Sequence, residues 1–370
     1  GMTATRRMAA VLKVTRGTLA RRLFLDRQAR FWAGRLDGRW ALDEPRARVV
    51  AVVDETRDVK SFVLRPGARW AGHRAGQYTT VEVEIDGVRV RRCYSLSSAP
   101  GDPLLRITVK RTPGGRVSRW LHEHVRRGDL LHLGAAAGDF VLPDELPARL
   151  LFVTGGSGVT PAMAILRELD ARGAVADVVF VHHARSASDA IFGAELAALA
   201  ARHPRLRLLF GFDDDAAGHG AFDEAKLAAA VPDFAERATW LCGPPGLMAR
   251  VERMWTDAGA AARLRHERFV APRVVASARP AGGAARAWTV QLARSGRRCT
   301  IDDGGTLLEA LERAGERPRH GCRMGICRTC ACTKRAGAVR NLVTGAVSSE
   351  PDEEIQLCIS EPLSDLELGL

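Results

Sequence analysis

The chain has 370 residues, enough for about two or three domains, and its apolar content allows each of them to bury a core. Its net charge of +12 comes mostly from scattered arginines. No helix-turn-helix, zinc-finger or RNA-recognition signature accompanies this charge, so we expect no nucleic-acid partner. No apolar run reaches the roughly 20 residues that a membrane span needs, and no apolar stretch of a secretory signal is present. We therefore expect a cytoplasmic protein.

Residues 1–45 form a basic extension whose composition is compatible with helix, and Pro45 ends it. Residues 2–48 contain twelve Lys and Arg but only four Asp and Glu, with Leu, Phe and Trp between the charges. One interpretation is peripheral contact with the inner face of a membrane, or with a membrane-bound partner, because anionic lipid attracts basic side chains. The other is a helical strap that packs across the following domains. Both stay open.

Residues 46–147 contain short β-prone stretches separated by Gly, Pro and Asp, which is typical of a small antiparallel barrel. The clearest stretches are Arg48–Val53, Ser61–Leu64, Tyr78–Ile85 and Leu105–Lys110.

Residues 148–270 alternate apolar strands with helical patterns, which predicts a parallel α/β sheet. The expected strands are Arg149–Thr154, Val178–Val181, Leu206–Phe210 and Thr239–Cys242, and the expected helices are Pro161–Arg172 and Glu195–Ala201. Residues 271–286, rich in Pro, Gly and Ala, predict a linker. Residues 287–370 then predict two strands, a helix over Thr306–Ala314 and a cysteine-rich loop.

Five of the eight cysteines lie between residues 322 and 358, which in a cytosolic protein indicates metal or redox chemistry. Four of them have the spacing C-x4-C-x2-C followed, after 27 intervening residues, by a fourth cysteine, which is the plant-type ferredoxin pattern. A zinc site would more often show two separated C-x2-C pairs, which are absent. We predict that a [2Fe–2S] cluster is bound by Cys322, Cys327, Cys330 and Cys358. Cys332 does not fit this spacing and is expected in the core.

Two motifs in the barrel region are suited to a flavin. Arg92-Cys93-Tyr94-Ser95 is expected after a strand, with Ser98 close behind. A guanidinium can bind a pyrophosphate, a Tyr ring can lie against a flavin, and a hydroxyl can reach the ring edge. Gly114-Gly115-Arg116-Val117-Ser118 then opens a helix, whose N-terminal N–H groups form a natural phosphate site.

Two further motifs lie at strand ends in the α/β region. Thr154–Pro161 is a glycine-rich turn between a strand and a helix, in which Gly156, Gly158 and Thr160 can approach a pyrophosphate. It is not a Rossmann fingerprint, because Pro161 stands where the third glycine would be. The other motif, Cys242-Gly243-Pro244-Pro245-Gly246, follows a later strand, where ligands of an open α/β sheet collect.

In this order, the four motifs and the cysteine loop resemble the ferredoxin–NADP reductase superfamily fused to a C-terminal plant-type ferredoxin, over residues ~46–370. The resemblance implies a multidomain fold with an antiparallel β-barrel flavin domain, a parallel α/β nucleotide domain and a β-grasp ferredoxin domain. It also implies an NAD(P)H:acceptor oxidoreductase with a bound flavin. The extended phosphate-site signature favours FAD over FMN as that flavin. The implied roles are flavin binding by Arg92, Tyr94, Ser95, Gly115, Val117 and Ser118, nucleotide binding by Gly156, Gly158 and Thr160, and positioning of hydride transfer by Cys242.

Within the superfamily, the chain looks most like the reductases that serve membrane fatty-acyl desaturases of the stearoyl-CoA type. The matching segments are the basic extension around Phe24-Leu25-Asp26 and Phe31-Trp32, the loop Cys322–Cys327, and Ile355-Gln356-Leu357-Cys358. The expected acceptor is thus a membrane-bound desaturase or hydroxylase. The alternatives are a ring-hydroxylating dioxygenase, a P450 or another monooxygenase and, in a different class, a non-catalytic redox sensor that retains the cofactors.

The electron donor is either NADPH or NADH. Arg185 and Ser186 follow a strand where relatives place readers of the 2′-phosphate, which favours NADPH. Asp213-Asp214-Asp215 would repel that phosphate. We expect NADPH, with NADH open. His122 and His124 are expected on a helix surface, and His182 and His183 in core packing near the nucleotide site.

Overall fold

The computed structural model describes residues 46–85, 88–214, 223–269, 287–302, 305–321, 323, 325 and 328–370. The predicted N-terminal extension and linker lie outside the described residues, as do Cys322 and Cys327. In the described part of the chain, no helix combines the length and the apolar character needed to cross a membrane.

The first unit is a six-stranded antiparallel sheet in the order β4-β3-β6-β1-β2-β5. A bridge between Leu96 and Ile107 joins the two ends of the sheet, so that it closes around a core. Helix α4 contributes Val117 and Leu121 to this core. The bounds are β1 Arg46–Thr56, β2 Val59–Pro66, β3 Tyr78–Ile85, β4 Val88–Ser95, β5 Leu105–Lys110, α4 Arg116–His124 and β6 Leu130–Leu133.

The second unit is a five-stranded parallel sheet in the order β11-β10-β7-β8-β9. Side chains alternate between its faces. Phe152 and Phe180 pack in the cluster that contains residues of α5 and α6, whereas Val153 packs in the cluster that contains residues of α7 and α8. The bounds are β7 Arg149–Gly155, α5 Val159–Ala171, β8 Asp177–Ala184, α6 Gly193–Arg202, β9 Leu206–Phe212, α7 Glu224–Ala230, β10 Ala238–Cys242, α8 Pro245–Asp257 and β11 Leu264–Glu267.

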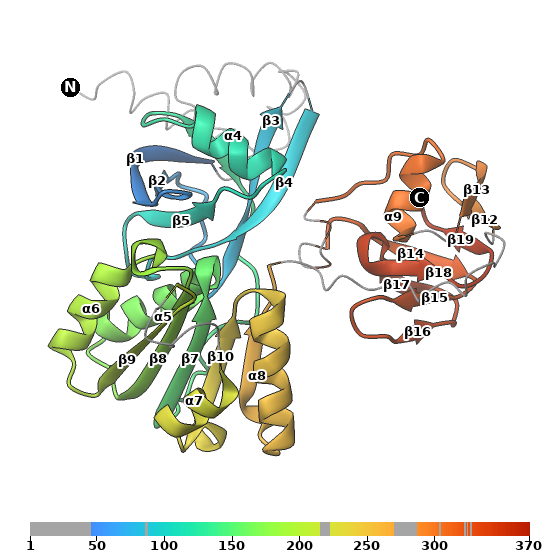
Figure 1. Ribbon diagram of the computed structural model, residues 1–370. Helices are drawn as coiled ribbons and strands as arrows, with labels where there is room; N and C mark the ends of the chain where they lie inside the picture. The colour runs from blue at the N-terminus through green and yellow to red at the C-terminus, as the bar shows by residue number, and fades with distance from the viewer. Residues whose placement is uncertain are drawn as a thin grey trace, which may run out of the picture.

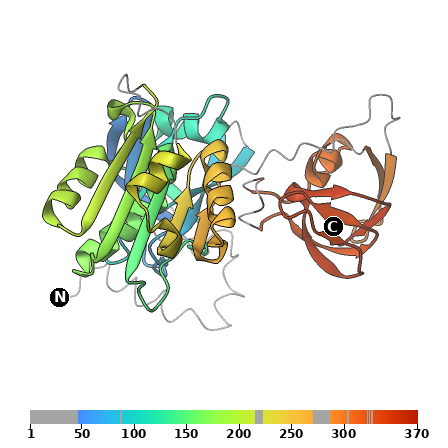
Figure 2. The same cartoon turned by 60° about the horizontal axis from the view of Figure 1, so that its bottom comes forward.

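The third unit lies beside the other two (Figures 1 and 2) and has a core of its own. It combines a five-stranded mixed sheet, order β13-β12-β19-β14-β17, with a three-stranded sheet, order β16-β15-β18. Helix α9 begins with a capping box formed by Thr306 and Glu309. The bounds are β12 Ala287–Leu292, β13 Arg298–Asp302, α9 Leu307–Arg313, β14 Ala331–Ala336, β15 Val339–Asn341, β16 Val347–Ser348, β17 Glu353–Gln356, β18 Ser360–Pro362 and β19 Leu366–Leu368.

The predicted fold class is therefore confirmed in all three units. One local expectation is wrong: His122 is buried rather than on the surface of α4, while His124 is exposed. The ring Nε2 of His122 lies 2.7 Å from the carbonyl oxygen of Val109 on β5, so the imidazole ties the helix to the barrel. Burial lowers the pKa of His122.

Candidate active site

The two turns with nucleotide motifs lie against each other at the carboxyl ends of β7 and β10. Strands β8 and β9 lie on one side of β7, and strands β10 and β11 lie on its other side. The strand order therefore reverses at β7, and a crevice opens at this point. A Cβ at Gly158 would lie 2.2 Å from the carbonyl oxygen of Cys242, and one at Gly155 would lie 2.7 Å from Cδ of Pro244. No side chain fits at either position, which explains both glycines by packing.

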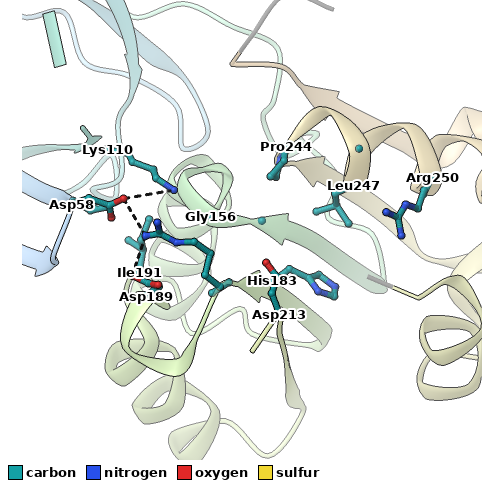
Figure 3. Close-up of a pocket in the computed structure, with 15 residues that line it drawn as sticks. Asp58, Lys110, Gly156, His183, Asp189, Ile191, Asp213, Pro244, Leu247 and Arg250 are labelled. Atoms are coloured by element: carbon teal, nitrogen blue, oxygen red, sulfur yellow. Dashed lines mark hydrogen bonds and ion pairs between the residues drawn. The ribbon is translucent and has the colours of Figure 1, made fainter. Parts of the chain in front are cut away.

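A cleft at this point brings together part of the predicted nucleotide site (Figure 3). Gly156, Arg185 and Pro244 line it. Thr160 is buried, and its hydroxyl donates to the carbonyl oxygen of Ser157 at 2.9 Å, within the turn itself.

Three other predicted nucleotide-site residues lie around the cleft. Gly243 packs behind it, with an ideal Cβ 3.1 Å from the backbone nitrogen of Gly155, and Gly158 is buried at the start of α5. The Ser186 hydroxyl donates to the carboxylate of Asp189 at 3.2 Å. The nucleotide roles of these residues stay predictions.

The cleft also contains charged residues that the sequence analysis did not single out. Asp58 and Lys110 come from the antiparallel unit, Asp189 follows β8, and Arg250 lies on α8. No local motif marks these residues, since they meet only when the β1–β2 hairpin packs against the parallel unit.

The two neighbouring histidines differ in position. His182 is fully buried, with Nδ1 2.9 Å from the Thr154 hydroxyl, and burial lowers its pKa to about 3. It is a neutral core residue, as expected. His183 instead lines the cleft and packs over Gly211 on β9, where an ideal Cβ would lie 2.4 Å from its ring.

The predicted flavin residues Arg92, Tyr94 and Ser95 lie within the last residues of β4, not after a strand as predicted. Ser95 is 4 % exposed, and its hydroxyl has no hydrogen-bond partner among the described residues. A buried hydroxyl of this kind needs a partner, and the edge of a flavin ring supplies one, so the residues fit the cofactor. Burial raises the pKa of the Tyr94 phenol, which stays protonated.

Arg92 and Ser98 have protein partners in addition. Nη1 of Arg92 donates to the carbonyl oxygen of Arg91 at 2.7 Å and to that of Gly321, before the cysteine loop, at 3.4 Å. The hydroxyl of Ser98 accepts from the backbone N–H of Arg106 at 3.1 Å.

The second flavin motif forms the beginning of α4. Gly115 is the N-cap residue, and no side chain caps the helix. The Ser118 hydroxyl accepts from the backbone N–H of Thr112 at 3.2 Å, and Val117 is buried in the barrel core. Val117 can therefore offer only its backbone N–H to a phosphate.

Cys242 has a neighbour that the sequence analysis missed. It pairs in register with Glu267 on β11, and its thiol is fully buried, which raises its pKa. The carboxyl oxygen Oε2 of Glu267 is buried without a hydrogen-bond partner in the described residues, and burial raises the pKa of Glu267 to about 8. Burial therefore favours the neutral form of both the Cys242 thiol and the Glu267 carboxyl. An acidic residue at the end of a strand was the only signal in the sequence.

The cysteine site is described for two of its four predicted ligands. Sγ of Cys330 and Sγ of Cys358 lie 3.1 Å apart, and the backbone N–H of Gly325 donates to Sγ of Cys358 at 3.2 Å. Gly325 adopts a positive φ of 76°, which lets its N–H point at the sulfur. Converging thiols that accept backbone N–H bonds fit a thiolate-bound iron–sulfur cluster. Cys332 is in the core, as expected, and burial raises the pKa of its thiol.

These three units and their sites define an NAD(P)H-dependent flavin and iron–sulfur oxidoreductase. Sequence models of three families match the chain in the same order. They are the oxidoreductase FAD-binding domain over residues 46–142, the oxidoreductase NAD-binding domain over residues 152–253 and the 2Fe-2S iron-sulfur cluster binding domain over residues 290–362.

Individual relatives share the whole arrangement. An NADPH oxidoreductase of Mycobacterium tuberculosis is 39 % identical over 90 % of this chain and 86 % of its own. The glycine betaine monooxygenase reductase subunit of Pseudomonas aeruginosa is 33 % identical over 88 % of this chain and 95 % of its own. The solved structure of phthalate dioxygenase reductase superimposes with a TM-score of 0.62 at 25 % identity, over 88 % of this chain and 97 % of that one.

The chain therefore belongs to the family of ferredoxin–NADP reductase-like FAD- and NAD-binding reductases with a C-terminal [2Fe–2S] ferredoxin domain. It is an NAD(P)H-dependent oxidoreductase whose cofactors are FAD, a [2Fe–2S] cluster and NAD(P)H.

Proposed function

We propose that this protein is the reductase component of an oxygenase system and passes electrons from NAD(P)H, through FAD and the [2Fe–2S] cluster, to a monooxygenase or dioxygenase component. The observation that carries the proposal is the arrangement of three units in one chain, which spans 95 % of the length of a glycine betaine monooxygenase reductase subunit. A 3-ketosteroid-9-alpha-monooxygenase reductase component of Mycobacterium tuberculosis, 33 % identical over 86 % of this chain, supports the same acceptor class.

The desaturase acceptor expected from the sequence has no support in the relatives described above. They favour the alternative of an oxygenase acceptor, which takes its place in the proposal.

Within the proposal, the residues at the cleft bind different parts of the nucleotide. The backbone of residues 155–158 and the N-terminus of α5 bind the pyrophosphate of the nucleotide, with Lys110 close by. Arg185 and Ser186 read the ribose end. The protonated carboxyl of Glu267 and the thiol of Cys242 exclude water behind the nicotinamide and offer it neutral hydrogen-bonding groups. When bound, FAD exchanges electron pairs with the nicotinamide and single electrons with the cluster.

The test combines the holoprotein with NADH or NADPH and a purified oxygenase component, and measures nucleotide oxidation together with oxygenated product. Product formation that depends on both proteins supports the proposal. Supply of electrons to a membrane desaturase but to no monooxygenase or dioxygenase component would overturn the acceptor class. Failure to oxidise either nucleotide would overturn the proposal as a whole.

A further inference from the structure

The β1–β2 hairpin of the flavin unit reaches into the nucleotide cleft. Its residue Val59 belongs to the same hydrophobic cluster as Ile191 and Phe192, which follow β8 in the nucleotide unit. The hairpin is therefore fixed by packing, and the neighbouring Asp58 lines the cleft with a side chain only 18 % exposed. Figure 3 shows Asp58 and Lys110 on one side of the cleft and Pro244, on the β10 turn, opposite them.

Asp58 pairs with two cations that line the cleft. Its Oδ2 lies 3.0 Å from Nη2 of Arg185, which follows β8, and 4.0 Å from Nζ of Lys110 on β5. Lys110 points at the glycine-rich turn, with Nζ 3.9 Å from the position of an ideal Cβ on Gly156. Burial raises the pKa of the Asp58 carboxyl, but the charges of Lys110 and Arg185 outweigh it and lower the pKa, so Asp58 is ionised at neutral pH.

Arg185 is thus shared between two carboxylates before any nucleotide arrives. Besides Asp58, it contacts Asp189 Oδ1 at 3.0 Å, and the Asp189 side chain is 7 % exposed. A nucleotide 2′-phosphate would have to draw Arg185 away from these partners and would add negative charge beside them. Asp213, exposed at the same cleft, adds to the repulsion. A 2′-hydroxyl has no such requirement.

We propose that Asp58, a residue of the flavin unit, is a specificity-determining residue for the electron donor: its carboxylate holds Arg185 across the interface of the two units and so weakens selection for the 2′-phosphate of NADPH relative to NADH. This inference rests on the proposed use of NAD(P)H at the cleft. It places a determinant of nucleotide choice outside the nucleotide unit.

The test compares Asp58→Asn with Asp54→Asn, a matched control on the same hairpin. Asp54 is 79 % exposed, pairs with Lys60 at 3.6 Å and does not line the cleft. Two quantities are measured on the holoprotein: the ratio of kcat/KM for NADPH to that for NADH with ferricyanide, and the affinity for 2′,5′-ADP relative to 5′-AMP by calorimetry. The second does not depend on electron transfer.

Asp58→Asn is expected to raise both ratios roughly two- to fivefold, the scale of one partly exposed ion pair. Asp54→Asn is expected to leave both ratios unchanged. The added substitution Arg185→Ala is expected to remove the gain. Equal changes for the two nucleotides, a loss of preference for 2′,5′-ADP, or joint loss of flavin and of both activities would overturn the inference and leave Asp58 an interface residue. In contrast, wild-type protein that oxidises neither nucleotide would overturn the proposed function instead.

Discussion

Glu267 is a carboxylic acid held neutral by its surroundings, and this makes protein stability depend on pH. Burial raises its pKa from 4.5 to about 8 in the folded state. Below pH ~4.5 the group is protonated in both states. Between pH ~4.5 and ~8 the unfolded chain releases the proton while the folded protein keeps it. The free energy of unfolding therefore falls as pH rises through this range.

Glu267→Gln keeps the shape of the protonated acid and removes the titration. The loss of stability between pH 5 and pH 8 should therefore be smaller in the variant, by roughly 3 kcal/mol. Thermal melts of both proteins across this range give the comparison, because all other titrating groups are shared. Parallel curves of Tm against pH would show that Glu267 is ionised in the folded protein.

Gly158 and Gly246 allow the packing of the two nucleotide turns to be tested by single substitutions. A methyl group at Gly158 would meet the backbone of Cys242 at 2.2 Å, whereas nothing lies within 4 Å of an ideal Cβ on Gly246 in α8. Gly158→Ala should lower the free energy of unfolding by roughly 1–3 kcal/mol, because backbone cannot move aside cheaply. Gly246→Ala should be neutral or raise it by up to about 1 kcal/mol. Chemical denaturation measures both, and equal effects would mean that the two turns separate easily.

Helix α5 links the nucleotide turn at its N-terminus to the flavin strand through Arg167. The Arg167 guanidinium donates to the carbonyl oxygen of Ser97, just after β4, and is held by Glu195 on α6 through bonds of 2.8 and 2.6 Å. The Arg167 side chain is 12 % exposed and lies over the ring of Phe192, 4.7 Å from its centre. The flavin strand and the nucleotide turn are thereby held to one rigid element.

Arg167→Met should slow reduction of the bound flavin by NAD(P)H about tenfold, because small displacements of reacting groups carry large rate costs. The affinity for 5′-AMP should not change, since Arg167 does not line the cleft. Stopped-flow flavin bleaching and calorimetry separate the two effects. The control is Arg172→Met. Arg172 directly follows the same helix and forms an exposed ion pair with Glu168, and its substitution should leave the rate unchanged. A lower nucleotide affinity with an unchanged rate would contradict the positioning role.

Strands and helices with strong patterns were predictable from the sequence, and single contacts between them were not. Tyr78–Ile85 and Leu105–Lys110 alternate or run apolar over their whole length, and the structure begins and ends these strands at the same residues. The expectation for His122 failed because the polar run His122-Glu123-His124 suggested a surface, although His122 lies on the face of α4 that points into the barrel. The motif Arg92–Ser95 was expected after a strand, yet all four of its residues belong to β4.

Across the whole molecule, the order of the three units and their chemistry followed from motifs that are local in sequence. The Asp58–Arg185 contact joins residues 127 positions apart, and Glu267 reaches Cys242 only through strand pairing. Such contacts depend on how the folded strands and helices pack against one another, so no residue spacing in the sequence predicts them. The identity of the electron acceptor is harder still to predict from the sequence, because it depends on a docking surface rather than on a motif.

Because the ferredoxin unit has a core of its own, electron transfer through its cluster can be abolished without disturbing the flavin unit. Cys330→Ser removes one predicted cluster ligand, whose sulfur lies 3.1 Å from that of Cys358, and leaves the two larger units untouched. Reduction of cytochrome c should fall by at least about tenfold because it needs the cluster, while ferricyanide reduction stays within about twofold because the flavin serves it directly. Cys299→Ser, on β13 of the same unit and half-buried, is the matched control and should retain both activities. Iron content and the visible spectrum report the loss of the cluster independently of turnover. If cytochrome c reduction survives in Cys330→Ser protein that has lost its iron, electrons leave from the flavin, and the ferredoxin unit is not the exit to the acceptor.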